Sequence, residues 1–243
     1  MADQKKAIVA GVGAERGLGG TLCRKFASGG HHVFVAGRTP AKIEAISDKI
    51  NANGGVATPV VTDVTRETEV IALFDVVADG PGVLDLAIYN AGNNTPGNVV
   101  GMEADYFEAA WRVCLYGGFL FGREAARRMA DSGGTLIFTG ASSSMRGRAG
   151  FGAFTAAKGG LRNFAQAMAK ECGPQGLHVG HVVVDGGING DRLRERFPAR
   201  VKEMGADRLV DLDGIAEGFC YLYRQPKTAW TFEVDVRTYL EPW

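Results

Sequence analysis

Short apolar runs alternate along the chain with longer stretches in which apolar residues recur every three or four positions. The short runs have the length of strands, and the longer stretches have the period of a helix that buries one face. The expected strands are 6–12, 33–36, 56–61, 84–89, 135–139, 177–184 and 231–236. The expected helices are 19–29, 42–53, 67–78, 105–130, 151–172 and 215–223.

This alternation predicts an α/β fold, a doubly wound parallel sheet of about seven strands with helices on both faces. The expected strands are apolar along nearly their whole length, which is typical of strands that are buried on both sides. No linker, repeat or change of composition divides the sequence. We therefore expect residues 1–243 to form a single domain.

The overall charge and the apolar segments narrow the range of partners. The chain has 27 Lys and Arg residues against 27 Asp and Glu residues, so it has no general attraction to nucleic acid or to an anionic membrane. No apolar segment approaches the ~18 residues of a membrane span. We expect a cytoplasmic protein that binds neither nucleic acid nor membrane. The four cysteines and four histidines show no metal-ligand spacing, and no metal site is expected.

Glycine is the residue type that composition singles out, with 35 in the chain, roughly twice the usual ~7%. Residues 11–20 read Gly-Val-Gly-Ala-Glu-Arg-Gly-Leu-Gly-Gly, between the first expected strand and the first expected helix. Glycines there permit a tight turn, let the backbone approach a pyrophosphate and allow close helix–strand packing. The N-terminus of the helix presents free N–H groups to the phosphates. The segment therefore predicts a Rossmann fold that binds a dinucleotide.

The spacing Gly13-x-x-x-Gly17-x-Gly19 resembles the short-chain dehydrogenase/reductase family, and further family motifs follow in order along nearly the whole chain. These are Asp63-Val64, Asn90-Ala91-Gly92, Phe154-Thr155-Ala156-Ala157-Lys158 where the family has Tyr-x-x-x-Lys, and Asp185-Gly186-Gly187-Ile188 where it has Pro-Gly-x-Ile. The cofactor-binding residues that the resemblance implies are Gly13, Arg16, Gly17, Leu18, Gly19, Arg38, Asp63, Val64, Asn90, Ala91, Gly92, Lys158, Gly186 and Ile188.

The end of the second expected strand bears on the choice between the two nicotinamide cofactors. An acid there binds the 2′-hydroxyl of NAD, whereas an arginine accommodates the 2′-phosphate of NADP. This chain has Gly37 where relatives that prefer NAD often carry Asp, and Arg38 follows it. Arg16 in the glycine-rich turn is a second cation. Guanidinium groups match phosphate geometry, so the sequence favours NADP(H) over NAD(H).

The catalytic residues that the resemblance implies are mostly absent. Lys158 matches, but Phe154 stands at the position of the Tyr that serves as the acid or base, and it has no hydroxyl. Ala141 stands at the position of the Ser, and Cys114 at that of the Asn. Positioned acid–base catalysis is worth ~10²–10⁴-fold, so its loss slows hydride transfer without abolishing it.

Other groups are candidates for the missing proton donor. Asp185 replaces a proline beside the expected nicotinamide, where it can act as an acid or steady a cationic substrate, or else cap a turn. Ser142 and Ser143 can present hydroxyls to the substrate, or else bond to loop backbone. The predicted catalytic set is Lys158, Asp185, Ser142 and Ser143.

The resemblance also implies a mobile substrate lid, which we place at 191–213. Its arginines can select an anionic substrate or form the solvated face of a helix. Relatives assemble through the two long helices, so a homodimer or homotetramer is expected.

Together these features predict an NADP(H)-dependent oxidoreductase that transfers hydride to a small carbonyl, imine or activated alkene without the usual Tyr acid. The alternative is a catalytically silent NADP(H)-binding or scaffold protein of the same fold.

Overall fold

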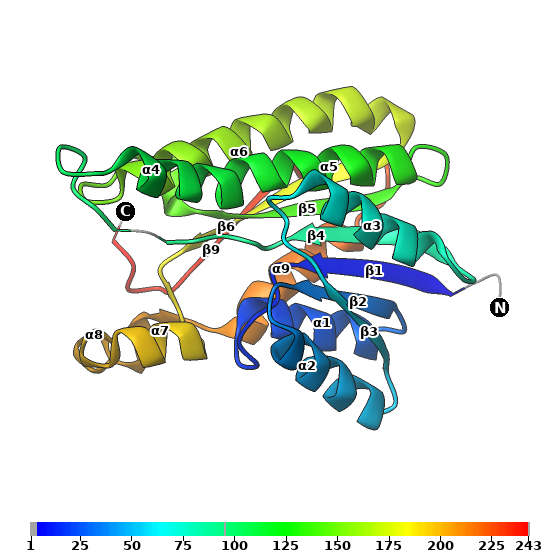
Figure 1. Ribbon diagram of the computed structural model, residues 1–243, viewed down its shortest axis with the longest axis horizontal. Coiled ribbons are helices and arrows are strands. Elements are labelled where there is room, and N and C mark those ends of the chain that lie inside the picture. The colour runs from blue at the N-terminus through cyan, green and yellow to red at the C-terminus, as the bar shows by residue number, and fades with distance from the viewer. Residues whose placement is uncertain (1–3, 95, 243) are drawn as a thin grey trace.

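Seven parallel strands form the central sheet, in the order β3-β2-β1-β4-β5-β6-β9 (Figure 1). They are β1 (Lys5–Ala10), β2 (His32–Gly37), β3 (Val56–Val61), β4 (Val83–Tyr89), β5 (Gly134–Ala141), β6 (Leu177–Asp185) and β9 (Glu233–Arg237). This computed structural model describes residues 4–94 and 96–242, so residues 1–3, 95 and 243 of the predicted domain lie outside the described residues. The predicted doubly wound parallel sheet is confirmed.

Helices cover both faces of the sheet (Figure 1). They are α1 (Leu18–Ser28), α2 (Pro40–Ala52), α3 (Glu67–Ala78), α4 (Ala104–Trp111), α5 (Gly117–Arg128), α6 (Gly152–Cys172) and α9 (Leu212–Tyr223). A small unit follows β6 and consists of β7 (Gly187–Ile188), α7 (Asp191–Arg196), α8 (Pro198–Met204) and β8 (Leu209–Val210). Among residues 4–94 and 96–242, no helix is both long and apolar enough to cross a bilayer.

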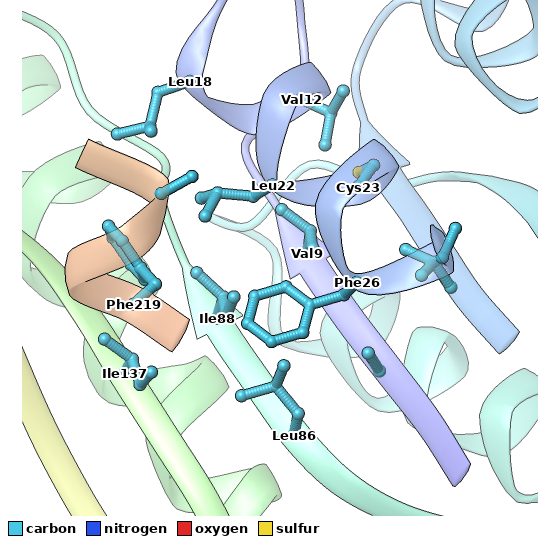
Figure 2. Close-up of a cluster of buried hydrophobic side chains, with 14 of the residues drawn as sticks. Val9, Val12, Leu18, Leu22, Cys23, Phe26, Leu86, Ile88, Ile137 and Phe219 are labelled. Atoms are coloured by element: carbon cyan, nitrogen blue, oxygen red, sulfur yellow. The ribbon is translucent and has the colours of Figure 1, made fainter. Parts of the chain in front are cut away.

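The apolar strands supply two cores because successive residues of a strand point to opposite faces. Val9 of β1 packs with Leu22 and Phe26 of α1 and with Phe219 of α9 (Figure 2). Its neighbour Ile8 belongs to the opposite core. That core also contains Phe74 of α3, Phe121 of α5 and Leu161 of α6. Burial of both faces therefore explains the continuous apolar runs of the sequence.

Residues 104–128 are helical without a break, so the expected helix 105–130 is confirmed over most of its length. A π-helical turn, η1 (Arg112–Tyr116), divides it into α4 and α5. The Tyr89 hydroxyl, at the end of β4, donates a hydrogen bond of 2.6 Å to the Val113 carbonyl. The backbone of Gly117 also passes close to this hydroxyl, since a Cβ on Gly117 would lie 2.5 Å from it. Single π-helical turns within an α-helix, known as π-bulges, are frequent at functional sites.

The order of the strands reverses direction at β1, which lies between β2 and β4. The connections that leave β1 and β4 therefore diverge at their carboxyl ends. In open parallel sheets, ligands bind in the crevice at this switch point. The loops after β1, β4, β5 and β6 all lie along this edge.

Candidate functional site

The glycine-rich turn fits closely against the loop that follows β4. Gly11 has φ +91°, and a Cβ there would lie 2.3 Å from the Ala91 nitrogen. A Cβ on Gly19 would lie 3.1 Å from the Gly11 carbonyl oxygen. No described heavy atom lies within 4 Å of the corresponding point at Gly13. Gly11 and Gly19 therefore allow the close packing of the turn, and Gly13 leaves open space beside it.

Helix α1 begins at this turn with an uncapped N-terminus. Gly17 is the N-cap, no side chain of the described residues caps it, and the first turn contains no acidic residue. Leu18 and Gly19 are the first residues of the helix. Its free N–H groups and positive dipole end are therefore available to an anion. The turn fits the pyrophosphate of a dinucleotide.

The region where an adenosine ribose would lie carries cations and no side chain at Gly37. A Cβ on Gly37 would lie 2.3 Å from the Val12 carbonyl oxygen, so this position accepts no side chain without a shift of the glycine-rich turn. Arg38 and Arg16 are both exposed. Arg16 is in the glycine-rich turn, and Arg38 directly follows β2.

Asp63 and Val64 follow β3 at the same edge of the sheet. The Thr65 N–H and hydroxyl donate to Asp63 Oδ1 at 3.0 and 2.8 Å. Burial opposes ionisation, but these hydrogen bonds and the charge of Arg38 outweigh it and lower the pKa of the Asp63 carboxyl. Val64 is buried.

Asn90, directly after β4, forms hydrogen bonds with residues at the ends of β1 and β5. Its amide donates to the Gly11 carbonyl at 3.2 Å, and its Oδ1 accepts from the Thr139 hydroxyl at 3.1 Å. The following Ala91 is the residue against which Gly11 packs. Gly92 then brings the chain to Lys158, since a Cβ on Gly92 would lie 3.4 Å from Nζ.

Lys158, in the second turn of α6, has a buried ammonium group. Its Nζ donates to the Thr139 carbonyl at 2.7 Å and lies 6.0 Å from the ring centroid of Phe154. Burial lowers the pKa of Lys158. The lysine is therefore positioned between the ends of β4 and β5, where it can donate hydrogen bonds to a ribose.

An apolar cluster lies beside Lys158. Phe154, Cys114 and Ala157 are its buried members, and Ala141 packs against them. Cys114 Sγ accepts a hydrogen bond of 3.4 Å from the Asn93 N–H. Three positions where the resemblance implies a hydroxyl or an amide are thus occupied by Phe154, Ala141 and Cys114, and they pack together rather than form a proton relay.

Asp185 is the last residue of β6 and is buried. Arg146 Nη2 lies 3.1 Å from its Oδ2 and 3.4 Å from its Oδ1. Arg237 Nη1, at the end of β9, lies 3.5 Å from Oδ2. Two guanidinium groups therefore hold the carboxylate. Gly186 follows with φ +139° and leads to Ile188 in β7.

The serines form a 3-10 turn, η2 (Ser142–Ser144), directly after β5. The Ser144 hydroxyl donates to the Ala141 carbonyl at 2.5 Å. Ser143 is buried and Ser142 is half-buried. The Ser144 hydroxyl thus bonds to loop backbone.

The segment expected to be a lid crosses the crevice. At its start, the Arg16 N–H donates to the Asp191 carboxylate at 3.0 Å, and the Asp191 N–H donates to the Arg16 carbonyl at 2.8 Å. Arg192 reaches the other wall and donates to the Gly92 carbonyl at 3.2 Å and to Asn93 Oδ1 at 2.9 Å. Helix α7 therefore joins the loops after β1 and β4.

The residues that sequence reasoning missed are Tyr89, Arg146 and Arg237, and for Asp191 and Arg192 of the predicted lid it missed their partners. None belongs to a local motif. Arg146 pairs with a residue 39 positions away, and Arg192 with one 99 positions away. Only the arrangement of the strand ends brings these pairs together.

Comparison with known proteins points to one family. The family model of short chain dehydrogenases matches residues 5–200. The uncharacterized oxidoreductase YxbG of Bacillus subtilis is 33% identical over 204 residues, covering 84% of this chain and 74% of that protein. Elsinochrome reductase 1 of Elsinoe fawcettii is 28% identical over 190 residues, covering 78% of this chain and 70% of that protein. A short-chain dehydrogenase structure from Rhodopseudomonas palustris has 33% identity and a TM-score of 0.82, covering 97% of this chain and 99% of that one.

Proposed function

Because the chain belongs to the short-chain dehydrogenase/reductase family of oxidoreductases, we propose that it binds NADP(H) and exchanges hydride with a small substrate. The substrate class is a carbonyl, an imine or an activated alkene. The step proceeds without the Tyr that usually serves the family as acid. When bound, the nicotinamide cofactor supplies the hydride chemistry, and the residues of this chain bind and orient the reactants.

The observation that carries this proposal is the fit of the crevice to a dinucleotide. The uncapped start of α1 takes the pyrophosphate, and the open space at Gly13 lets the backbone approach it. The Lys158 ammonium holds the nicotinamide ribose through the donors that Thr139 does not use. Asp63 and Val64 border the adenine, and Gly186 and Ile188 border the nicotinamide.

NADP(H) is proposed over NAD(H) because the ribose end carries Arg16 and Arg38. The packing of Gly37 against Val12 supports this assignment, since a carboxylate at position 37 has no room. A guanidinium group also gives a 2′-phosphate two parallel hydrogen bonds.

The chemistry of the site favours a substrate that needs little help from an acid. Phe154 donates no proton, and Asp185 is held by two guanidinium groups. We propose that the Ser142 and Ser143 hydroxyls contact the substrate. Asp185 acts as the acid only with substrates that displace Arg146 from its carboxylate. An iminium ion arrives already protonated. Hydride addition to an activated alkene leaves the negative charge on the polarising group, and the resulting anion takes its proton from water. Neither substrate therefore requires a proton donor among the residues of the site.

A second function, a catalytically silent NADP(H)-binding or scaffold protein, is favoured by one observation. The cluster of Phe154, Cys114 and Ala157 fills the region of the usual proton relay with apolar and thiol groups. A silent protein binds NADPH tightly and consumes none of it. Incubation of the purified protein with NADPH and a panel of ketones, imines and activated alkenes separates the two functions.

We also propose that the protein is cytoplasmic and that it assembles as a homodimer or homotetramer through α4, α5 and α6. Phe107 and Trp111 of α4 are 43% and 37% exposed, which suits an interface between copies. Residues 191–213 are proposed to open as the substrate lid, with Arg192 as the contact that holds it closed.

A further inference from the structure

We infer that Arg146, held in place by Asp185, binds a carboxylate group of the substrate. This inference rests on the proposed function, since it names the substrate class for the same crevice. It assigns a role to a residue that lies outside every motif of the sequence. The argument depends on the position of Arg146, on its contacts and on the donors that these contacts leave.

Arg146 lies at the ligand edge of the sheet. It follows the turn η2 at the end of β5, and its N–H donates to the Ser142 carbonyl at 3.1 Å. Asp185 ends the neighbouring strand β6, which pairs with β5 up to Ala141 and Val184. The ion pair thus bridges two adjacent strand ends on the side of the crevice that the nicotinamide and substrate would occupy.

The turn η2, which precedes Arg146, also contacts the helix of Lys158. A Cβ on Gly159, the residue after Lys158, would lie 3.9 Å from the Ser144 carbonyl oxygen. Ser142 and Ser143 precede Arg146 in the same turn. The guanidinium, the two hydroxyls and the ammonium therefore belong to two elements in direct contact.

Asp185, the residue that holds Arg146, is itself buried and held in place. The Asp185 side chain is 2% exposed and the Arg146 side chain 47%. Arg237 contacts the same carboxylate from β9, so Asp185 cannot turn away without losing a second ion pair. Arg237 is itself paired with Asp235, which leaves Asp185 as the common partner of the cluster.

The contacts of Arg146 leave part of its guanidinium group available. Asp185 engages Nη2 alone. Nε and Nη1 have no acceptor among residues 4–94 and 96–242, although they carry three of the five N–H donors of the group. Hydrogen bonds from these donors to a carboxylate are charge-assisted, which makes them shorter and stronger than neutral ones. Because the side chain is already ordered, it loses little further freedom on binding.

A purely structural ion pair is the competing explanation, in which Arg146 only braces the loop after β5. This explanation predicts no difference between an acid and its ester as ligands. The carboxylate site predicts a difference that depends on Arg146.

The test is isothermal titration calorimetry of the purified chain with matched pairs of probes. Each pair is an acid and its methyl ester: benzoate, phenylpyruvate and 2-oxoglutarate, titrated with and without NADPH. The wild type is expected to bind at least one acid 10- to 100-fold more tightly than its ester, as hydrogen bonds to a charged group suggest. Arg146→Ala is expected to lose this preference, and Arg146→Lys to keep part of it, since a lysine retains the charge without the planar fork.

Arg127→Ala is the matched control. It removes the same charge from the last turn of α5, next to the opposite end of the sheet. Circular dichroism and thermal unfolding show whether each variant is folded, and Arg146→Met, which keeps the apolar stem, replaces an unfolded Arg146→Ala. Equal binding of acids and esters by the wild type, or an undiminished preference in the folded Arg146→Ala or Arg146→Met variant, overturns the inference. If the wild type does not bind NADPH, the proposed function is overturned. The titrations without NADPH then still test the carboxylate site.

Discussion

The Lys158 ammonium lies 6.0 Å from the ring centroid of Phe154, one helical turn earlier on α6. Residues four apart on a helix are neighbours on one face. A hydroxyl added to this ring is the smallest change that restores an acid beside the lysine. We expect Phe154→Tyr to gain reductase activity toward simple ketones by at least about 10-fold, because positioned acid–base catalysis is worth ~10²–10⁴-fold. Absorbance of NADPH measures it, and Phe164→Tyr, on the same helix, is the control. No gain in a folded variant that binds NADPH contradicts the positioning of Phe154.

The cofactor preference depends on Arg38. Replacement by aspartate removes a hydrogen-bonding cation and places a carboxylate near the 2′-phosphate. We expect Arg38→Asp to weaken NADPH binding about 10- to 100-fold and to leave NADH binding equal or stronger. Fluorescence titration of both cofactors provides the measurement, with Arg66→Asp as a charge-matched control after β3. A wild type that binds both cofactors equally well would sink the assignment.

Gly37 tests the packing that excludes a side chain at the end of β2. A Cβ there would lie 2.3 Å from the Val12 carbonyl oxygen, which is backbone and cannot rotate away. We expect Gly37→Ala to lower the free energy of unfolding by about 1–3 kcal/mol, as overpacking does. Gly13→Ala, where no described atom lies within 4 Å, should cost less. Urea denaturation measures both, and equal stability of the two variants argues against this geometry.

Asp185 has two possible roles that one substitution separates. If it is the acid, Asp185→Asn abolishes NADPH consumption with ketones and leaves consumption with iminium substrates intact. If it only positions Arg146, the variant raises KM for acids and changes kcat little. Steady-state kinetics with both substrate classes distinguishes these results. Unchanged kinetics with every substrate removes Asp185 from the site.

Glu233 makes stability depend on acidic pH. Its carboxylate contacts the His181 ring, with Nδ1 2.9 Å from Oε2, and accepts two hydrogen bonds from Arg162 at 2.6 and 2.9 Å. The His181 contact and then Arg162 lower the pKa of Glu233 to about 2 against the effect of burial. The native carboxylate therefore stays charged where the unfolded one takes up a proton. This stabilisation is complete above the ordinary pKa of 4.5 and is lost as the pH falls toward 2.

We expect this carboxylate to contribute about 1–2 kcal/mol near neutral pH, because solvent screens part of the charge of a partly exposed group. Urea denaturation of the wild type and Glu233→Gln between neutral pH and pH 3 measures it. The difference between the two proteins should shrink as the pH falls. Glu44→Gln, an exposed position of α2, is the control. A constant difference contradicts the prediction.

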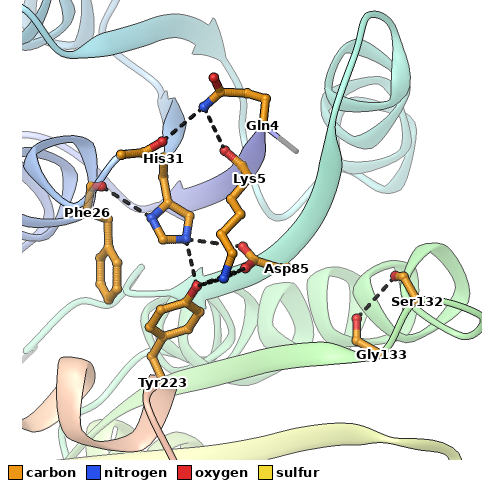
Figure 3. Close-up of polar contacts among 9 residues, drawn as sticks. Gln4, Lys5, Phe26, His31, Asp85, Ser132, Gly133 and Tyr223 are labelled. Carbon is orange, nitrogen blue, oxygen red and sulfur yellow. Dashed lines mark hydrogen bonds and ion pairs between the residues drawn. The ribbon is translucent and has the colours of Figure 1, made fainter. Parts of the chain in front are cut away.

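A further group of titratable residues lies near the amino ends of the strands, away from the crevice. His31, Asp85 and Tyr223 are joined by hydrogen bonds of 2.8–3.1 Å, and Lys5 reaches both Asp85 and Tyr223 (Figure 3). The cluster connects β1, β4 and α9. Its groups satisfy one another, so it serves the fold rather than the chemistry.

The sequence predicts those parts of the molecule that depend on local patterns. Apolar runs mark the strands because burial on both faces requires apolar side chains at every position. The glycine-rich turn is predictable because Gly11 and Gly19 must lack a Cβ to pack against Ala91 and against each other. Lys158 follows from a motif within one helix.

The remaining parts depend on contacts between distant segments. The π-turn at Arg112–Tyr116 has no signature in the apolar pattern, because the Tyr89 hydroxyl that bonds to it comes from another strand. The pairing of Arg146 with Asp185 requires that β5 and β6 be neighbours with aligned ends. The reach of Arg192 to Asn93 requires the path of α7 across the crevice.

The central claim is that the chain transfers hydride from NADPH although Phe154 occupies the place of the Tyr acid. The most direct test is the rate of NADPH oxidation by the purified wild type with the panel of ketones, imines and activated alkenes. We predict oxidation with an imine or an activated alkene, faster than with any ketone, and its loss in Lys158→Met. Tight binding of NADPH with no oxidation by any acceptor would contradict the claim and identify a silent nucleotide-binding protein.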